Sequence, residues 1–76
     1  MTVEEKNFIK SKIIVLIKNQ KEITIDDAIE YLDYVNKVRY SYTEINPILK
    51  ELLIEGKVAK KENNFFLEIK QKAPKK

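Results

Sequence analysis

Cysteine and histidine are both absent from this 76-residue chain. Their absence excludes disulfides, thiolate nucleophiles, imidazole acid–base catalysis and zinc sites built from cysteine or histidine. A single glycine leaves no glycine-rich loop that would hold a phosphate, and no nucleophile is patterned beside a base. We therefore expect no enzymatic activity, no metal and no cofactor.

Long apolar runs are missing as well. The longest, IIVLI at residues 13–17, is far shorter than the roughly 20 residues needed to cross a bilayer. Glu4 and Glu5 precede any apolar run, so we expect no secretory signal. These features and the lack of cysteine predict a soluble, cytoplasmic protein that does not contact a membrane. The length predicts one domain with a small core.

Positive charge gathers in the second half of the chain. Residues 1–36 hold five lysines and seven acids, a net charge of −2. Residues 37–76 hold nine lysines and one arginine against five acids, a net charge of +5. Such asymmetry is typical of a domain that binds nucleic acid. The alternative is a solvated, lysine-rich surface that has no partner.

Apolar spacing predicts a first helix over residues 3–19. One face is lined at helical spacing by Ile9, Ile13, Leu16 and Ile17. Phe8 and Val15 form a second apolar line, which favours a central helix covered from two directions. The alternative is a dimer contact through Phe8, Ser11 and Val15.

Residues 22–24 are short and β-branched, and they predict a small first strand that pairs with a later hairpin. Thr24 is expected to cap a second helix in an imperfect capping box with Asp27. The predicted buried face of this helix consists of Ile25, Ala28, Ile29, Leu32 and Val35. Residues 34–40 form the connection to a third helix.

The third helix is predicted to begin between Ser41 and Thr43 and to end at Glu55, with Ser41 and Glu44 as a capping box. Pro47 falls inside it and removes one backbone hydrogen bond. A start at Asn46, with Pro47 as the first helical residue, is the alternative. Gly56 fits the left-handed conformation that ends a helix.

A hairpin is predicted next, with strands at Lys57–Glu62 and Phe65–Gln71 joined by a turn at Asn63 and Asn64. Phe65, Leu67 and Ile69 alternate with other residues, so one face is expected to be buried, with Val58 beside Ile69. The domain is predicted to cover residues 1–71, followed by a disordered basic tail at 72–76. The fold class is therefore α+β, in the order helix, strand, helix, helix, strand, strand.

The third helix carries the candidate reading residues. With Leu49 pointing inward, the expected core residues are Tyr42, Ile45, Leu52 and Leu53. The residues expected to point outward are Thr43, Pro47, Lys50 and Ile54, with Asn46 at the boundary. Thr43 and Asn46 suit base edges in a major groove, because both form hydrogen bonds and asparagine pairs with adenine.

The flanks must supply most of the positive charge, because the third helix itself has a net charge of −2. The flanking cations are Lys37, Arg39, Lys57, Lys60 and Lys61. One phosphate for each of these and for Lys50 predicts a logarithmic salt slope of about −5. Asn63 and Asn64 are hypothesised to enter a minor groove. Stacking of single-stranded bases on Tyr34, Tyr40 and Tyr42 is an alternative that we do not favour, since such rings more often complete a core.

Taken together, these segments resemble the winged helix-turn-helix transcription regulators. The resemblance is carried by ITIDDAIEYL, by INPILKELLIEGKV and by AKKENNFFLEI, and it covers roughly residues 3–71. The size and the bias toward lysine, isoleucine and glutamate are similar to those of small regulators encoded by crenarchaeal viruses and plasmids. The long connection at 34–40, Pro47 and the acidic third helix depart from the family pattern.

The resemblance implies sequence-specific binding to double-stranded DNA, usually as a dimer on a palindrome, with the third helix in the major groove and the wing beside it. The candidate DNA-binding residues are Lys37, Arg39, Ser41, Thr43, Asn46, Pro47, Lys50, Lys57, Lys60, Lys61, Asn63 and Asn64. The alternative is a winged-helix module in which the Phe8 and Val15 line or the tyrosines bind another protein.

Overall fold

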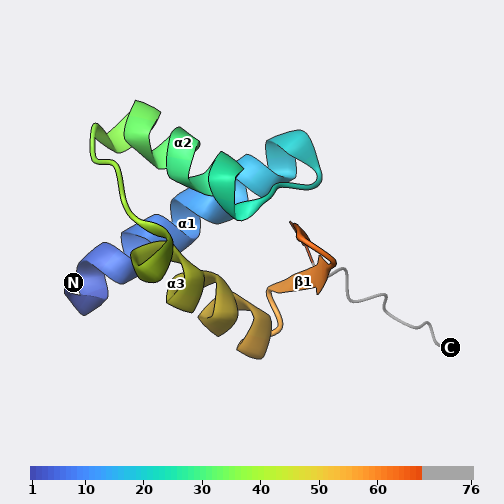
Figure 1. The fold of residues 1–76 in the computed structure, drawn as a ribbon. Coiled ribbons are helices and arrows are strands. Elements are labelled where there is room, and N and C mark those ends of the chain that lie inside the picture. The colour runs from blue at the N-terminus through green and yellow to red at the C-terminus, as the bar shows by residue number, and fades with distance from the viewer. Residues whose placement is uncertain (68–76) are drawn as a thin grey trace, which may run out of the picture.

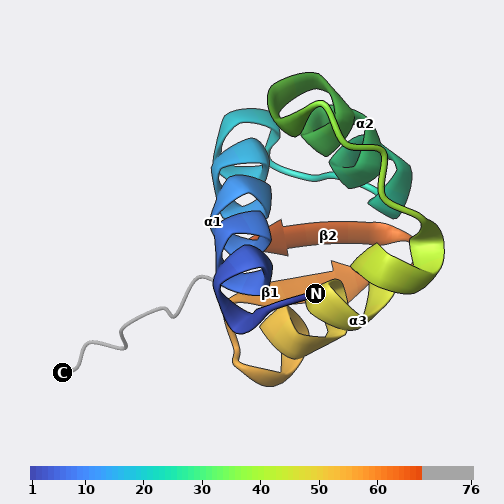
Figure 2. The ribbon, with the colours of Figure 1, turned by 90° about the vertical axis from the view of Figure 1, so that its left-hand side faces the viewer.

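Three helices are followed by a two-stranded antiparallel hairpin in the computed structural model, which describes residues 1–67 (Figure 1). The elements are α1 (Val3–Gln20), α2 (Ile25–Asn36), α3 (Tyr42–Ile54), β1 (Val58–Lys61) and β2 (Asn64–Leu67). Figure 2 shows α1 along one side of the domain, whereas β1 and β2 meet at their turn on the opposite side. The α+β class and the order of the helices and the hairpin are confirmed.

The core lies between the three helices and the hairpin, and fifteen side chains are buried in it. Ten of them are leucine or isoleucine from the helices, namely Ile9, Ile13, Leu16, Ile17, Ile29, Leu32, Ile45, Ile48, Leu49 and Leu52. Val58 and Phe65 close the core from the hairpin. None of the helices within residues 1–67 is both long and apolar enough to cross a membrane.

α1 buries the predicted face but is not covered on its second side. Thr2 caps the helix by accepting a hydrogen bond from the Glu5 backbone N–H at 3.0 Å. Phe8 and Val15, which we expected to be covered, remain 47% and 44% exposed. That expectation was wrong because α2, α3 and the hairpin all pack on the other side of α1.

The predicted first strand is reduced to a single bridge. Ile23 and Phe65 exchange two backbone hydrogen bonds of 2.9 and 2.7 Å, so β2 lies between Ile23 and β1. Immediately after Ile23, Thr24 begins α2. Its side chain accepts from the Asp27 N–H at 3.2 Å while Asp27 accepts from the Thr24 N–H at 3.0 Å, which confirms the capping box.

α3 starts at Tyr42 with Ser41 as its cap, so Pro47 lies inside the helix and the alternative start at Asn46 is wrong. The predicted core residue Tyr42 is 54% exposed, because it stands in the first turn beyond the packed part of the helix. Ile48 is buried, although it was not among the core residues predicted from an inward-pointing Leu49. The buried face of α3 is therefore turned toward Ile48.

Gly56 ends α3 as predicted, with a φ of +77°. Its N–H donates to the Leu53 carbonyl at 3.1 Å, and the Lys57 N–H donates to the Leu52 carbonyl at 3.0 Å. This is the Schellman arrangement of helix ends, and it turns the chain directly into β1.

The predicted hairpin turn was wrong by one residue. Lys61 pairs with Asn64, so Glu62 and Asn63 connect the strands, and Glu62 takes the left-handed φ of 57°. Asn64 instead belongs to β2, where its side-chain amide donates to the Glu22 carboxylate at 2.8 Å. This contact and the bridge at Ile23 fix the register of β2.

Val58 pairs with Leu67. Its predicted neighbour Ile69, the rest of the predicted return strand and the tail at 72–76 lie outside the described residues.

Candidate nucleic-acid interface

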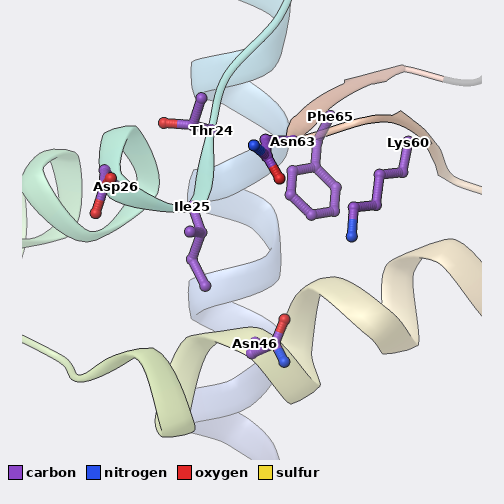
Figure 3. Close-up of a pocket in the computed structure, with 7 residues that line it drawn as sticks. All are labelled: Thr24, Ile25, Asp26, Asn46, Lys60, Asn63 and Phe65. Carbon is purple, nitrogen blue, oxygen red and sulfur yellow. The ribbon is translucent and has the colours of Figure 1, made fainter.

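Three residues predicted to contact DNA line one cavity of about 340 Å³. Asn46 belongs to α3, Lys60 to β1 and Asn63 to the hairpin turn (Figure 3). The Lys60 side chain extends from the hairpin toward Asn46. The start of α2 forms the remaining wall, and the full lining is Thr24, Ile25, Asp26, Asn46, Lys60, Asn63 and Phe65. Separate elements thus bring an amide and an ammonium group to one opening.

The exposed face of α3 adjoins this cavity. Thr43 lies three residues before Asn46, so the two are neighbours on the helix surface. Pro47, Lys50 and Thr43 are all exposed, and Ile54 at the end of the same face is 85% exposed. The structure therefore confirms that the predicted outward residues of α3 share one solvent-facing surface.

A carboxylate occupies the N-terminal tip of α3. Glu44 accepts a 2.9 Å hydrogen bond from the Ser41 backbone N–H, and the Ser41 hydroxyl donates to the same carboxylate at 3.3 Å. The Ser41 hydroxyl also lies 2.9 Å from that of Thr43. Because Glu44 places a negative charge at the tip, a phosphate gains less there than the helix dipole alone would give it.

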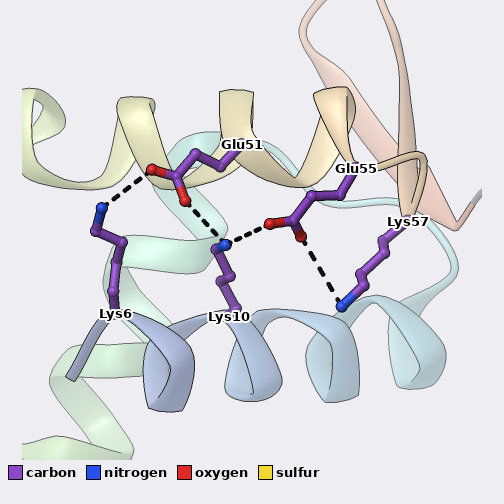
Figure 4. A network of polar contacts seen from close by, with 5 residues as sticks. All are labelled: Lys6, Lys10, Glu51, Glu55 and Lys57. Atoms are coloured by element: carbon purple, nitrogen blue, oxygen red, sulfur yellow. Dashed lines mark hydrogen bonds and ion pairs between the residues drawn. The ribbon is translucent and has the colours of Figure 1, made fainter. Parts of the chain in front are cut away.

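Glu51 of α3 and Glu55, which follows the last residue of α3, point toward α1. Glu51 lies 3.0 Å from the Lys6 ammonium and 2.8 Å from that of Lys10, and Glu55 lies 2.8 Å from Lys10 and 3.8 Å from Lys57 (Figure 4). Hydrogen bonds from Lys10 and then Lys6 lower the pKa of Glu51, and those to Glu51 and then Glu55 raise the pKa of Lys10. The acidity of α3 is thus neutralised on the flank away from its exposed face.

We expect Glu51→Gln to reduce the acid sensitivity of the fold. Because the folded-state pKa of Glu51 lies below 4.5, its ion pairs stabilise the protein above that pH and are lost as the pH falls. The slope of unfolding free energy against pH between about 3 and 5 should therefore be smaller in the variant. Urea titrations across this range measure it. Glu30→Gln removes an exposed α2 carboxylate that has no ion pair within residues 1–67, and it should leave the slope nearly unchanged. An equal slope in wild type and Glu51→Gln would contradict these ion pairs.

The basic residues before α3 do not line the cavity. Arg39 is 3.2 Å from the Asp33 carboxylate, and the Lys37 ammonium lies 6.0 Å from the centre of the Tyr34 ring. Lys37 itself ends α2 in a left-handed conformation with a φ of 61°. These two cations therefore lie near the end of α2 and away from the hairpin tip.

On the hairpin, Lys60 and Lys61 are exposed, and the Lys60 ammonium lies 5.6 Å from the centre of the Phe65 ring. Within residues 1–67 neither pairs with a carboxylate, and the same holds for Lys50 on α3. The Lys57 ammonium, in contrast, forms an ion pair with the Glu55 carboxylate. Of these cations Lys60 lines the cavity, Lys50 lies one helical turn beyond Asn46 on α3, and Lys61 follows Lys60 on β1.

The three tyrosines considered for stacking differ in exposure. Tyr40 is buried, and its hydroxyl donates to Glu5 at 3.1 Å; burial and this hydrogen bond raise its pKa. The Tyr42 hydroxyl donates to Asp26, which raises the Tyr42 pKa. Tyr34 is exposed on α2. The burial of Tyr40 excludes its use as a stacking ring.

Sequence reasoning missed two parts of this surface. The first is the α2 wall of the cavity, where Asp26 was not among the residues predicted to contact DNA. The second is the pairing of α1 with α3. Lys6 and Lys10, like Glu51 and Glu55, are four residues apart, so each pair lies on one side of its helix. That shared spacing is the signal that the sequence offers, although only the fold shows that the two sides face each other.

Comparisons with protein-family models, with curated proteins and with solved structures find no match to the chain. Its function is therefore inferred from the geometry and the charges of these residues.

Proposed function

We propose that this chain is a transcription regulator of the winged helix-turn-helix type that binds double-stranded DNA sequence-specifically. The exposed face of α3 enters the major groove, and the β1–β2 hairpin acts as a wing on the flanking backbone or minor groove. The observation that carries this proposal is the meeting of Asn46 from α3 with Lys60 and Asn63 from the hairpin at one cavity. An asparagine amide suits a base edge and a lysine suits a phosphate, so the two chemistries required for specific binding lie side by side.

The strand arrangement supports the comparison of the hairpin with a wing. Ile23 bridges to β2, and β2 pairs with β1, so a short segment before α2 extends the hairpin as a third strand would. Gly56 turns α3 straight into β1. The helix and the hairpin are therefore held in a fixed relation, as a two-part DNA contact requires.

The charge distribution supports the same proposal. Glu51 and Glu55 are paired with lysines on the α1 flank, whereas Lys50, Lys60 and Lys61 form no ion pair within residues 1–67. Positive charge is therefore available beside Asn46, at Lys50 one turn along α3 and at Lys60 across the cavity. The proposed activity is binding, without catalysis.

Titration of duplex DNA at several salt concentrations tests the proposal. Lys37, Lys50, Lys60 and Lys61 have no carboxylate partner within residues 1–67, and four phosphate contacts predict a logarithmic salt slope of about −3 to −4. A slope near −5 would show that Arg39 and Lys57 exchange their carboxylates for phosphates. An absence of binding to duplex DNA, or an affinity that does not change with salt, would contradict the proposed phosphate contacts. Selection of bound oligonucleotides from a random pool then gives the preferred sequence.

A further inference from the structure

One exposed side of α1 carries a regular stripe of five residues, Glu4, Phe8, Ser11, Val15 and Lys18. Successive members are four, three, four and three residues apart, which is the heptad spacing of a helix that packs along another helix. We call these five residues the α1 stripe. Phe8 and Val15 are 47% and 44% exposed, although both are large and apolar.

The α1 stripe lies opposite the buried face of the helix. With 3.6 residues per turn, the stripe is centred about 165° around the helix from the four buried residues of α1. Within residues 1–67, neither Phe8 nor Val15 belongs to the core or packs against it. A single exposed apolar residue is ordinary, but two at heptad spacing with charges at both ends form a surface that suits a partner helix.

We propose that the α1 stripe joins two copies of this chain through antiparallel pairing of their α1 helices. The stripe is nearly symmetric about Ser11, because Phe8 and Val15 lie three and four residues away, and Glu4 and Lys18 each lie seven residues away. Antiparallel pairing places Phe8 beside Val15 of the second copy and Glu4 beside Lys18 of the second copy. A parallel pair would instead set Glu4 against Glu4 and Lys18 against Lys18. Charge complementarity therefore selects an antiparallel second copy as the occupant.

The centre of the stripe suits a close approach. Ser11 is small, and its hydroxyl already donates to the Phe8 carbonyl at 2.8 Å, so covering it leaves no polar group without a partner. At the edge, the Lys12 ammonium lies 5.2 Å from the centre of the Phe8 ring. The Lys12 stem can therefore cover the rim of the contact while its charge stays in water.

Sedimentation equilibrium of the free protein tests the proposal. We expect the mass to rise from that of the 9.0 kDa chain toward twice that value as the concentration increases. Phe8→Ser/Val15→Ser should weaken association by about tenfold or more, because four apolar side chains leave the contact. A wild-type mass that stays monomeric up to about 1 mM would overturn the proposal. Equal association of the double variant would overturn it as well.

Exchange of the end charges tests the antiparallel orientation. Glu4→Lys and Lys18→Glu should each weaken association, because each sets like charges against one another. The double variant Glu4→Lys/Lys18→Glu should restore it. Both changes oppose the helix dipole, so recovery in the double variant cannot come from a better helix. Circular dichroism checks that each variant folds, and Glu30→Lys on α2 is the matched charge control. Failure of the double variant to recover would overturn the antiparallel pair.

Discussion

Replacing Lys60 and Lys61 together by alanine is expected to weaken binding to every duplex by about 10- to 60-fold at 0.1 M salt. Both side chains are exposed on the hairpin, and neither has a carboxylate partner within residues 1–67. Each phosphate contact releases counterions, so losing two should also reduce the logarithmic salt slope by nearly 2. Fluorescence anisotropy at several salt concentrations measures both quantities.

The control for this experiment is Lys12→Ala/Lys21→Ala. It removes one positive charge from α1, at Lys12, and one from Lys21, the residue that caps the end of α1. If net charge alone attracted DNA, the two double variants would bind equally weakly. A selective loss with the hairpin variant locates the contact, since the hairpin turn and α1 lie on opposite sides of the domain. The loss should be the same for selected and random sequences, because phosphates carry no sequence information.

Asn46→Ala is expected to remove most of the preference for the selected sequence. An asparagine that pairs with adenine contributes about 1–3 kcal/mol of discrimination, which corresponds to roughly 5- to 150-fold in the ratio of specific to random affinity. Affinity for random DNA and the salt slope should change little, because the amide carries no charge. Competition binding with the selected and a scrambled duplex measures the ratio.

Asn7→Ala provides the matched control, since it makes the same substitution at an exposed position in α1. It should leave both affinities unchanged. A parallel fall on selected and random DNA with Asn46→Ala would show that Asn46 does not read bases. In that case the hairpin lysines would still account for non-specific binding. The two experiments therefore distinguish sequence recognition by Asn46 from the electrostatic affinity supplied by Lys60 and Lys61.

Local signals in the sequence predicted the helices well. Thr24 and Asp27 form the expected capping box, and Gly56 ends α3 in the expected conformation. These features depend on side chains and backbone groups within a few residues of one another. Such contacts are encoded by the segment itself, so they are readable without knowledge of the rest of the fold.

The errors arose where a distant partner decides the outcome. The turn preference of asparagine favoured Asn63 and Asn64, but Glu22 and Ile23 hold Asn64 and Phe65 in β2 and shift the turn by one residue. The turn propensity of asparagine is a weaker constraint than the two backbone hydrogen bonds between Ile23 and Phe65. The prediction that Phe8 is covered failed for the same reason, since the apolar character of a side chain does not show which other elements pack against it.

The candidate site was predictable in its residues but not in its charge. The helical spacing of α3 predicted that Thr43 and Lys50 point outward and that Asn46 lies at the boundary, and all three are exposed. The same helix was interpreted as acidic throughout, because its sequence does not show that Glu51 and Glu55 face lysines on α1. Charge pairing between elements that are far apart in the chain requires the fold.

The placement of α1 has a geometric consequence for two copies joined along it. The hairpin turn lies on the side of the domain opposite α1, so a two-fold axis between paired α1 helices directs the two wings away from each other. Two such wings would contact DNA at the outer ends of the pair, so the pair would span a longer stretch of DNA than a single copy does.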